Sequence, residues 1–552
     1  MEKAIVQVLL LLLVAAMVSV GARKLKLPYT LALVVAGIVL GLLHLPHLAG
    51  LSLTPELLLA IFLPALLFEA AYHVQLKRFL PDAPAILLLA VPGVMVAVTV
   101  TALSSYALLS WSPLALPLGM SFLFASVIAA TDPISVLAMF KSLGVHRRLY
   151  LIVEGESLLN DGVAVVVFAI VGAVLGIHTG HGAAPHLEGT ADIVVFGLKT
   201  FGWMVGAGVT FGVVCGAVVS LLVRVVDDKL VETSLTVILA YGSFLVAEHF
   251  GASGVLSCVT AGVTLNVLGT PYGMSPKTRV AIVDFWEFMA FFANTFVFLL
   301  VGIEMDSVAL LDGVVPVLLA FVAVLGGRAA AVYLLGPLMG RFGSVRPIPK
   351  AWKHVLVWGG LRGSLSMVLV IGLPQDLPGR SSLLILVFGV VAMSLFVQGL
   401  SMRPFLAALR LIGQGVRADD YEAARGRALM ASAAVREIGR QEHHHTFFPP
   451  VLVRIRAHYE SRVAHSRAEA ERLAGDALPL EHTQEAALHL LTIEGEALRH
   501  AVAEGIVGAD VAEPIFAELA LRREALSHDE DPEHLKIVID RMLDSTPPGA
   551  TG

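Results

Sequence analysis

The chain has 552 residues, of which 57% are hydrophobic and only 15% are Asp, Glu, Lys or Arg. A soluble protein carries about 25% charged residues, so this composition excludes an ordinary soluble domain and indicates a polytopic membrane protein. Only two cysteines are present, both in apolar segments, and the net charge is −6. These values exclude a disulfide framework and a Cys-based zinc site, and they give no indication of a nucleic-acid partner.

Apolar stretches follow one another through the first three quarters of the chain. A helix needs about 20 such residues to cross the hydrocarbon core of a bilayer. Thirteen stretches qualify, at residues 4–22, 29–46, 55–72, 84–109, 114–140, 149–178, 193–224, 231–250, 253–268, 280–304, 309–338, 350–373 and 381–400. We expect an all-α membrane domain over residues 1–410 with about 13 transmembrane helices. The first stretch is interpreted as a retained span because no clear cleavage site follows it.

Positive charges alternate between the connections of these stretches. The odd-numbered connections contain Arg23, Lys24, Lys26, Lys77, Arg78, Lys141, Arg147, Arg148, Arg224, Lys229, Lys277, Arg279, Arg341, Arg346, Lys350 and Lys353. The even-numbered connections contain almost none, with Arg380 as the exception. Cytoplasmic loops of membrane proteins are enriched in Lys and Arg, so we expect the N-terminus outside and the C-terminal tail in the cytoplasm.

The fifth and twelfth stretches are interrupted in the middle, by Thr131-Asp132-Pro133 and by Gly359-Gly360-Leu361-Arg362-Gly363. If the thirteen spans divide as six, one and six, these two spans occupy equivalent positions in two inverted six-helix repeats. Paired interrupted helices of this kind indicate a binding site near the middle of the membrane. Because both breaks carry a charge, at Asp132 and Arg362, we predict an ion site where the helices are broken.

The first break contains the oxygen atoms that a cation requires. Pro133 cannot continue a hydrogen-bonded helix but suits the first turn of a new one. Thr131 and Asp132 then cap that second half-helix, and the half-helix before it ends with free carbonyl groups near Ala130. Carboxylate, hydroxyl and carbonyl oxygens are together the ligands of hard cations.

The sixth stretch adds a second carboxylate. Glu154, Ser157 and Asp161 are spaced i, i+3 and i+7 and so share one helix face, with Asn160 beside Asp161, whereas Glu156 points elsewhere. An ionised Asp161 at this depth is costly without a partner. Either a proton or a cation neutralises it, and that mutual exclusion is proton-coupled exchange. One proton for one cation is the simplest stoichiometry.

These segments resemble those of monovalent cation/proton antiporters of the bacterial NhaP type, which are relatives of animal sodium/proton exchangers. The resemblance rests on Phe62-Leu63-Pro64-Ala65-Leu66-Leu67-Phe68-Glu69-Ala70, Thr131-Asp132-Pro133, Glu154-Gly155-Glu156-Ser157-Leu158-Leu159-Asn160-Asp161 and Gly359-Gly360-Leu361-Arg362-Gly363. It implies an electroneutral sodium/proton antiporter of the inner membrane, without a cofactor. It also implies a homodimer that works by elevator-like movement of a core domain, with crossed broken helices.

The resemblance implies a role for each matching residue. Asp161 corresponds to the essential proton- and cation-binding acid, and Asp132, Ser157 and the Thr131 carbonyl to further Na⁺ ligands. Asn160 corresponds to the residue that marks the electroneutral branch.

Charged neighbours of the site also have counterparts in the family. Glu69 is similar to an acid that acts near the site through water. Arg362 is similar to the charge that compensates the crossed helices, with Glu69 as its expected partner. Glu156 and Arg328 resemble a structural ion pair, and Glu154 is a further charge nearby.

The tail, residues 413–552, differs from the rest in being charged and alanine-rich. It contains helix-like segments at 418–441, 451–475, 481–504 and 509–528, with breaks at Pro449-Pro450 and Pro479. We expect a helical cytoplasmic domain that regulates the protein or stabilises a dimer. It has no glycine-rich phosphate loop, so the sequence predicts no nucleotide site of that kind.

Three alternatives remain open at this point. The same architecture can exchange K⁺ for protons, because ligand types alone do not select the cation. A gated cation channel would conduct without an obligatory proton. A membrane-anchored sensor would use the tail as its output.

Overall fold

A computed structural model describes residues 2–25, 29–43, 58–177, 189–226, 228–304, 313–339, 348–444, 449–474, 491–502 and 506–527, and all regular elements in these ranges are helices. The chain forms two compact units, Met1–Ile412 and Gly413–Gly552. Each unit is described by itself.

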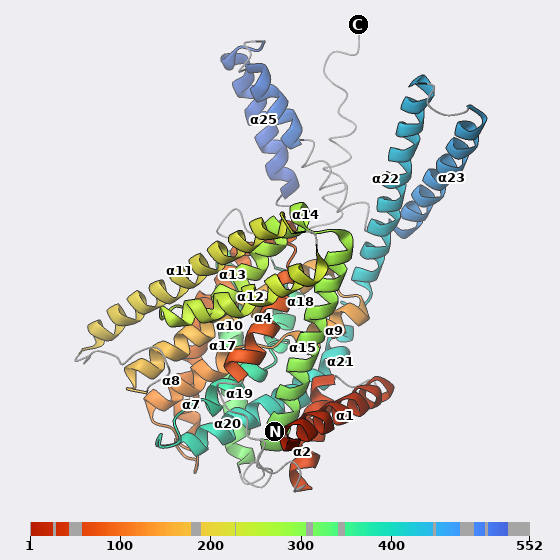
Figure 1. Ribbon diagram of the computed structural model, residues 1–552. Coiled ribbons are helices and arrows are strands. Elements are labelled where there is room, and N and C mark those ends of the chain that lie inside the picture. Colours follow the sequence, from red (N-terminus) through yellow and green to blue (C-terminus); the bar gives the residue numbers. More distant parts are fainter. Residues whose placement is uncertain are drawn as a thin grey trace. The chain divides into compact units, whose positions relative to one another are not determined.

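Helices of the first unit are shown in Figure 1. The first half contains α1 (Glu2–Leu25), α2 (Tyr29–Leu42), η1 (Leu58–Phe62), α4 (Leu63–His73), α5 (Leu76–Phe79), η2 (Leu80–Asp82), α6 (Ala83–Ala90), α7 (Pro92–Leu109), α8 (Leu118–Ala129), α9 (Ile134–Leu143) and α10 (Arg147–Val174). The second half contains α11 (Thr190–Val223), α12 (Lys229–His249), α13 (Gly254–Thr264), η3 (Leu265–Gly269), α14 (Thr270–Gly273), α15 (Pro276–Glu304), α17 (Val314–Met339), α18 (Lys350–Trp358), α19 (Ser364–Ile371), α20 (Arg380–Met393), η4 (Ser394–Gly399) and α21 (Leu400–Ala408).

Among the described residues, eight helical segments are long and apolar enough to cross a membrane, and four shorter apolar helices accompany them. The predicted class, an all-α polytopic membrane protein, is therefore confirmed. Several predicted boundaries differ from the helices, most clearly in the last predicted stretch, 381–400, which continues through η4 and α21 to Ala408. The apolar pattern weakens at Arg403 and Pro404, but a helix can extend beyond the apolar run that defines a span.

Both predicted interruptions are present. The fifth predicted span consists of α8 and α9, which are separated by residues 130–133, and the twelfth consists of α18 and α19, separated by residues 359–363. Asp132 Oδ1 accepts a hydrogen bond of 3.0 Å from Ile134 N at the start of α9, as predicted. Thr131 does not cap this helix, because its hydroxyl bonds Ser157 and Asn160, and the helix begins at Ile134, one residue after Pro133. At the other end of α9, Gly144 adopts a left-handed conformation, φ = 61°, that favours glycine and ends the helix.

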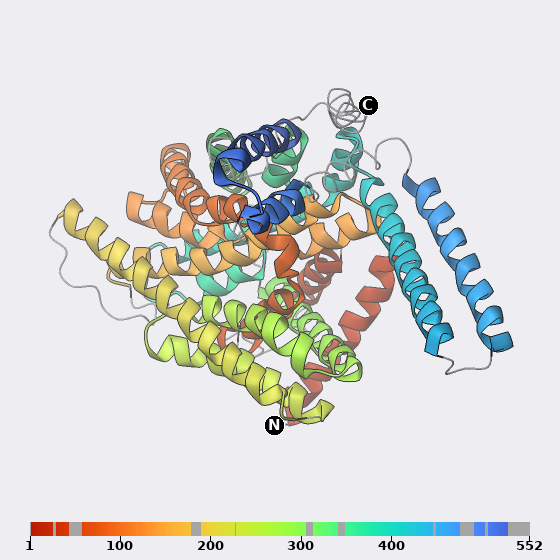
Figure 2. The same ribbon diagram turned by 90° about the horizontal axis from the view of Figure 1, so that it is seen from above.

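Two groups of helices make up the first unit. In one group α7 packs against α8 and α17, α17 packs against α20, and α10 packs against α8. In the other group α2 packs against α15, and α13 packs against α4, α11 and α12. Seen from above in Figure 2, α11 and α12 lie side by side along one edge of the unit. The helix α10 contacts both groups, since it also packs against α11 and α13, and it carries the sixth-span residues of the predicted site.

The second unit contains α22 (Gln414–His444), α23 (Pro449–Ala474) and α25 (Ala509–Ser527), and residues 491–502 are also helical. The helices α22 and α23 pack against each other (Figure 1). They cover the first two predicted tail segments, and α25 covers the fourth. Residues 481–490 and 503–504 of the third segment lie outside the described residues.

Candidate functional site

The two helix breaks meet in space. Asp132 N, in the first break, donates a 2.8 Å hydrogen bond to Leu361 O in the second. A Cβ atom added to Gly363 would lie only 2.1 Å from the Cβ of Asp132. The two backbones therefore touch at the crossing, and glycine is required there because any side chain would occupy the space of Asp132.

Arg362 occupies the end of the first half-helix. Its Nη1 donates to the carbonyl oxygens of Ile128 (2.6 Å) and Ala129 (2.7 Å) and, at 3.3 Å, to that of Ala130. The last carbonyls of a helix have no partner within it and carry a partial negative charge. Arg362 satisfies these groups, so the predicted compensation of the broken helix is present. The expected pairing with Glu69 is wrong, because the guanidinium is used by the α8 carbonyls and Glu69 lies against His73.

The second half-helix has its own arginine. Arg328, on α17, donates from Nε to Leu356 O near the end of α18, at 3.1 Å. Its two terminal nitrogens bind both carboxylate oxygens of Glu156, at 2.6 and 2.8 Å. Both side chains are buried. The expected ion pair between the sixth and eleventh helices is thus present, and it also caps the second broken helix.

Oxygen atoms from α10 and the first break lie together beside this crossing. The Ser157 hydroxyl donates to the backbone carbonyl of Thr131 and accepts a 3.3 Å bond from the Thr131 hydroxyl. Three of the predicted cation ligands are therefore neighbours. They are the Ser157 hydroxyl, the Thr131 carbonyl and the carboxylate of the adjacent Asp132.

Asn160, also on α10, contacts the first break. Its amide nitrogen donates to Ala129 O, Thr131 Oγ1 and Glu156 Oε1 at 3.2–3.4 Å. It is absent from the residues that line the cavity described next. Asn160 was expected beside Asp161 as part of the site, but its amide binds Ala129 and Thr131 and so connects α10 to the helix break instead of lining the cavity.

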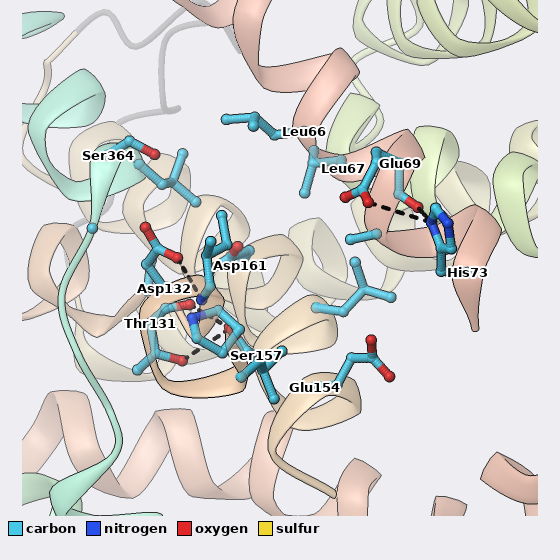
Figure 3. A pocket seen from close by; sticks show the side chains of 18 of the residues that line it. Leu66, Leu67, Glu69, His73, Thr131, Asp132, Glu154, Ser157, Asp161 and Ser364 are labelled. Carbon is cyan, nitrogen blue, oxygen red and sulfur yellow. Dashed lines mark hydrogen bonds and ion pairs between the residues drawn. The ribbon is translucent and has the colours of Figure 1, made fainter. Parts of the chain in front are cut away.

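A cavity of about 330 Å³ leads to the two acids. Asp132, Ser157, Asp161, Thr131 and Glu154 line it together with residues of α4, α9, α15 and the start of α19. In Figure 3, Asp132 and Asp161 lie next to each other in this cavity, with Ser157 and Thr131 close by and Ser364 across from them. Oδ1 of Asp161 is buried and accepts no hydrogen bond from the described residues.

The mouth of the cavity is acidic. Glu69 and His73, one turn apart on α4, are 3.3 Å apart at Oε1 and Nδ1, and Glu287 Oε1 of α15 lies 4.0 Å from His73 Nε2. The side chain of Glu287 is 63% exposed, so the cavity is continuous with the surface here. Glu154 accepts a 3.4 Å bond from Tyr150 and also lines the cavity, rather than forming a structural pair.

His73 and Tyr150 were not predicted as part of the site. The i, i+4 spacing of Glu69 and His73 on a helix is a signal that could have identified His73. Tyr150 has the same spacing from Glu154.

Carboxylates where two broken helices cross, at the end of a cavity in a protein with many apolar helices, are typical of secondary ion transporters. Residues 8–408 match the transmembrane family of sodium/hydrogen exchangers. The chain therefore belongs to the sodium/hydrogen exchanger family, a family of transporters.

Similar proteins include the Na⁺/H⁺ antiporter NhaG of Bacillus atrophaeus, which is 34% identical over 91% of this chain and 94% of its own length. The Na⁺/H⁺ antiporter ApNhaP of Aphanothece halophytica is 39% identical over 76% of this chain and 78% of its own length. The fold resembles that of the sodium proton antiporter MjNhaP1 from Methanocaldococcus jannaschii, with a TM-score of 0.59 and 17% identity over 74% of this chain and all of that one.

Proposed function

We propose that this protein is an electroneutral antiporter that exchanges Na⁺ for H⁺ at Asp161. The observation that carries the proposal is the carboxylate of Asp161, which lines the cavity and whose buried Oδ1 has no hydrogen-bond partner among the described residues. An ionised carboxylate cannot remain there alone at low cost. Proton and cation are alternative partners for the same group.

The charges at the crossing support a single elementary charge per cycle. Three carboxylates (Asp132, Glu156, Asp161) face two guanidinium groups (Arg328, Arg362), which leaves one negative charge. Glu156 is neutralised by Arg328, and Asp132 accepts a backbone N–H at the start of α9, where the helix dipole favours a negative charge. Asp161 remains as the group that needs one proton or one monovalent cation.

Na⁺ would take its ligands from groups that currently bind each other. The Ser157 hydroxyl covers the Thr131 carbonyl, and both are oxygen ligands suited to a hard cation. A cation bound by Asp161, Asp132, Ser157 and the Thr131 carbonyl would replace this hydrogen bond. Protonation of Asp161 would restore it, so binding of one ion favours release of the other.

The architecture in our proposal has thirteen transmembrane segments: the eight long helices, the four shorter ones and the broken α18–α19 pair. Two inverted six-helix repeats are supported by the equivalent breaks, each capped at its first half-helix by an arginine.

The cavity mouth lies at the end of α4, near the positively charged connections, so it would open to the cytoplasm. The N-terminus would lie outside and the tail inside, in a homodimer of the bacterial inner membrane.

Exchange by purified protein in proteoliposomes tests this function. An imposed Na⁺ gradient should drive proton movement that does not change when the membrane potential is clamped at different values. Asp161→Asn preserves the shape of the side chain but removes the charge that a proton or a cation would neutralise. This variant should reduce the exchange rate to that of empty liposomes. Asp376→Asn, which removes an exposed carboxylate outside the cavity, should transport normally.

Other results would reject the proposal in distinct ways. Exchange driven by K⁺ but not Na⁺ would replace the sodium antiporter with a potassium antiporter of the same architecture. Na⁺ current without proton movement would indicate a channel. Unchanged exchange by Asp161→Asn would reject the assignment of the site.

A further inference from the structure

A polar groove lies between the two packed helices of the second unit. Its volume is about 610 Å³, within the range of roughly 300–1,000 Å³ for small-molecule sites. It is lined by Arg427 from α22 and by His458, Ser461, Arg462, His465, Ser466 and Glu469 from α23. No apolar side chain belongs to the lining, so the groove is not suited to an apolar segment.

Nearly all of the lining groups can donate hydrogen bonds. Two guanidinium groups, two imidazoles and two hydroxyls face one carboxylate, Glu469. That carboxylate already binds Arg427, at 3.0 Å. The groove therefore presents an excess of donors and positive charge, which a cation would not favour and an acceptor-rich anion would.

Three of the groups have no polar partner among the described residues. Arg462 lies over the Tyr459 ring, 5.5 Å from its centre, and His458 contacts the same residue. Neither these two side chains nor His465 forms a hydrogen bond or ion pair with any described residue. Their spacing of i, i+4 and i+7 puts all three on the face of α23 that borders the groove.

We propose that this groove binds a phosphate-bearing anion. Arginine presents several N–H groups in a planar fork that matches phosphate oxygens, and such charge-assisted bonds are stronger than neutral ones. The two serine hydroxyls and the imidazoles supply further donors around the same space. The phosphate belongs either to a soluble metabolite or to a lipid headgroup, and the chemistry of the groove is the same for both.

Calorimetric titration of the full-length protein tests the site without any transport measurement. In phosphatidylcholine nanodiscs, ATP or inorganic phosphate should bind saturably, with one site per chain. Arg462→Gln should weaken that binding at least tenfold, because it removes a cation that has no other polar partner in the part of the tail that the structure describes. The matched control is Arg467→Gln, which removes an exposed arginine of the same helix outside the groove.

A second set of nanodiscs identifies the source of the phosphate. If phosphatidylglycerol in the disc blocks ATP binding, and Arg462→Gln changes the lipid affinity, the occupant is a lipid headgroup. If ATP or inorganic phosphate binds equally well with and without phosphatidylglycerol in the disc, the occupant is a soluble anion. Absence of saturable binding in both membranes, or equal loss of binding in Arg462→Gln and Arg467→Gln, would overturn the proposal. Because the readout is heat of binding, failure here would leave the proposed exchange untouched.

Discussion

Individual charges at the helix crossing differ in whether the protein itself satisfies them. Arg362 is used by three carbonyls, and Glu156 and Arg328 bind each other through two hydrogen bonds. Such groups are fixed parts of the structure, because removing one partner leaves an uncompensated charge. Asp161 is different, since its Oδ1 has no hydrogen-bond partner among the described residues, and in the proposed exchange a proton or a cation neutralises it.

The Glu156–Arg328 pair gives a prediction for single residues. Glu156→Leu leaves Arg328 buried without its counter-charge, so it should lower the free energy of unfolding by about 3–5 kcal/mol. Glu156→Leu combined with Arg328→Met should cost clearly less than the sum of the two single changes. The double variant should not recover fully, since Leu356 O loses its donor at a cost of about 1–3 kcal/mol. Denaturation in mixed SDS micelles measures all four proteins, and additive effects would contradict the coupling.

The broken helices are the elements that build the site. Each break was visible in the sequence, because Pro133 and three glycines within five residues are incompatible with a continuous helix. The face of α10 that carries Glu154, Ser157 and Asp161 was also predictable from helical spacing. The partners of each side chain could not be predicted in this way, because they depend on how elements that are distant in sequence pack together.

Two examples illustrate that limit. The carbonyls that Arg362 binds become available only when α8 ends beside the second break, so the local sequence around Arg362 does not identify them. Asn160 is adjacent to Asp161 in sequence, yet a rotation of 100° per residue was enough to direct its amide to Ala129 and Thr131 instead of the cavity. Tail residues 481–490 and 503–504 lie outside the described residues, so these parts of the expected third tail helix stay a prediction.

Gly363 provides a prediction for these elements. Gly363→Ala would introduce a Cβ 2.1 Å from that of Asp132, so the two breaks could no longer cross at their present distance. The variant should have a lower melting temperature and no measurable exchange. Gly399→Ala serves as control, since its Cβ would meet nothing within 4 Å. A Gly363→Ala protein that melts and transports like the parent would contradict the close contact of the breaks.

At the scale of the whole molecule, the cavity reaches the surface at one end. Ala138 lines it on α9, whereas Leu103 of α7 is 50% exposed on the outside of the unit. In a background with Cys215→Ala and Cys258→Ala, Ala138→Cys should react with a membrane-impermeant thiol reagent added from the cytoplasmic side. Leu103→Cys should stay unlabelled because it faces lipid. Labelling of Ala138→Cys only from the outer side would reverse the proposed orientation.

The hydrogen bond from Asp132 N to Leu361 O has a consequence for the rate of ion transport. It joins the two chain breaks that surround the acids, so the ligands cannot draw apart to leave a continuous aqueous pathway without losing it. In the proposed antiporter each ion is carried through a full conformational cycle, and movements of that size take microseconds to milliseconds. We expect the flux to saturate at a ceiling of roughly 10³–10⁶ ions per second, however steep the gradient.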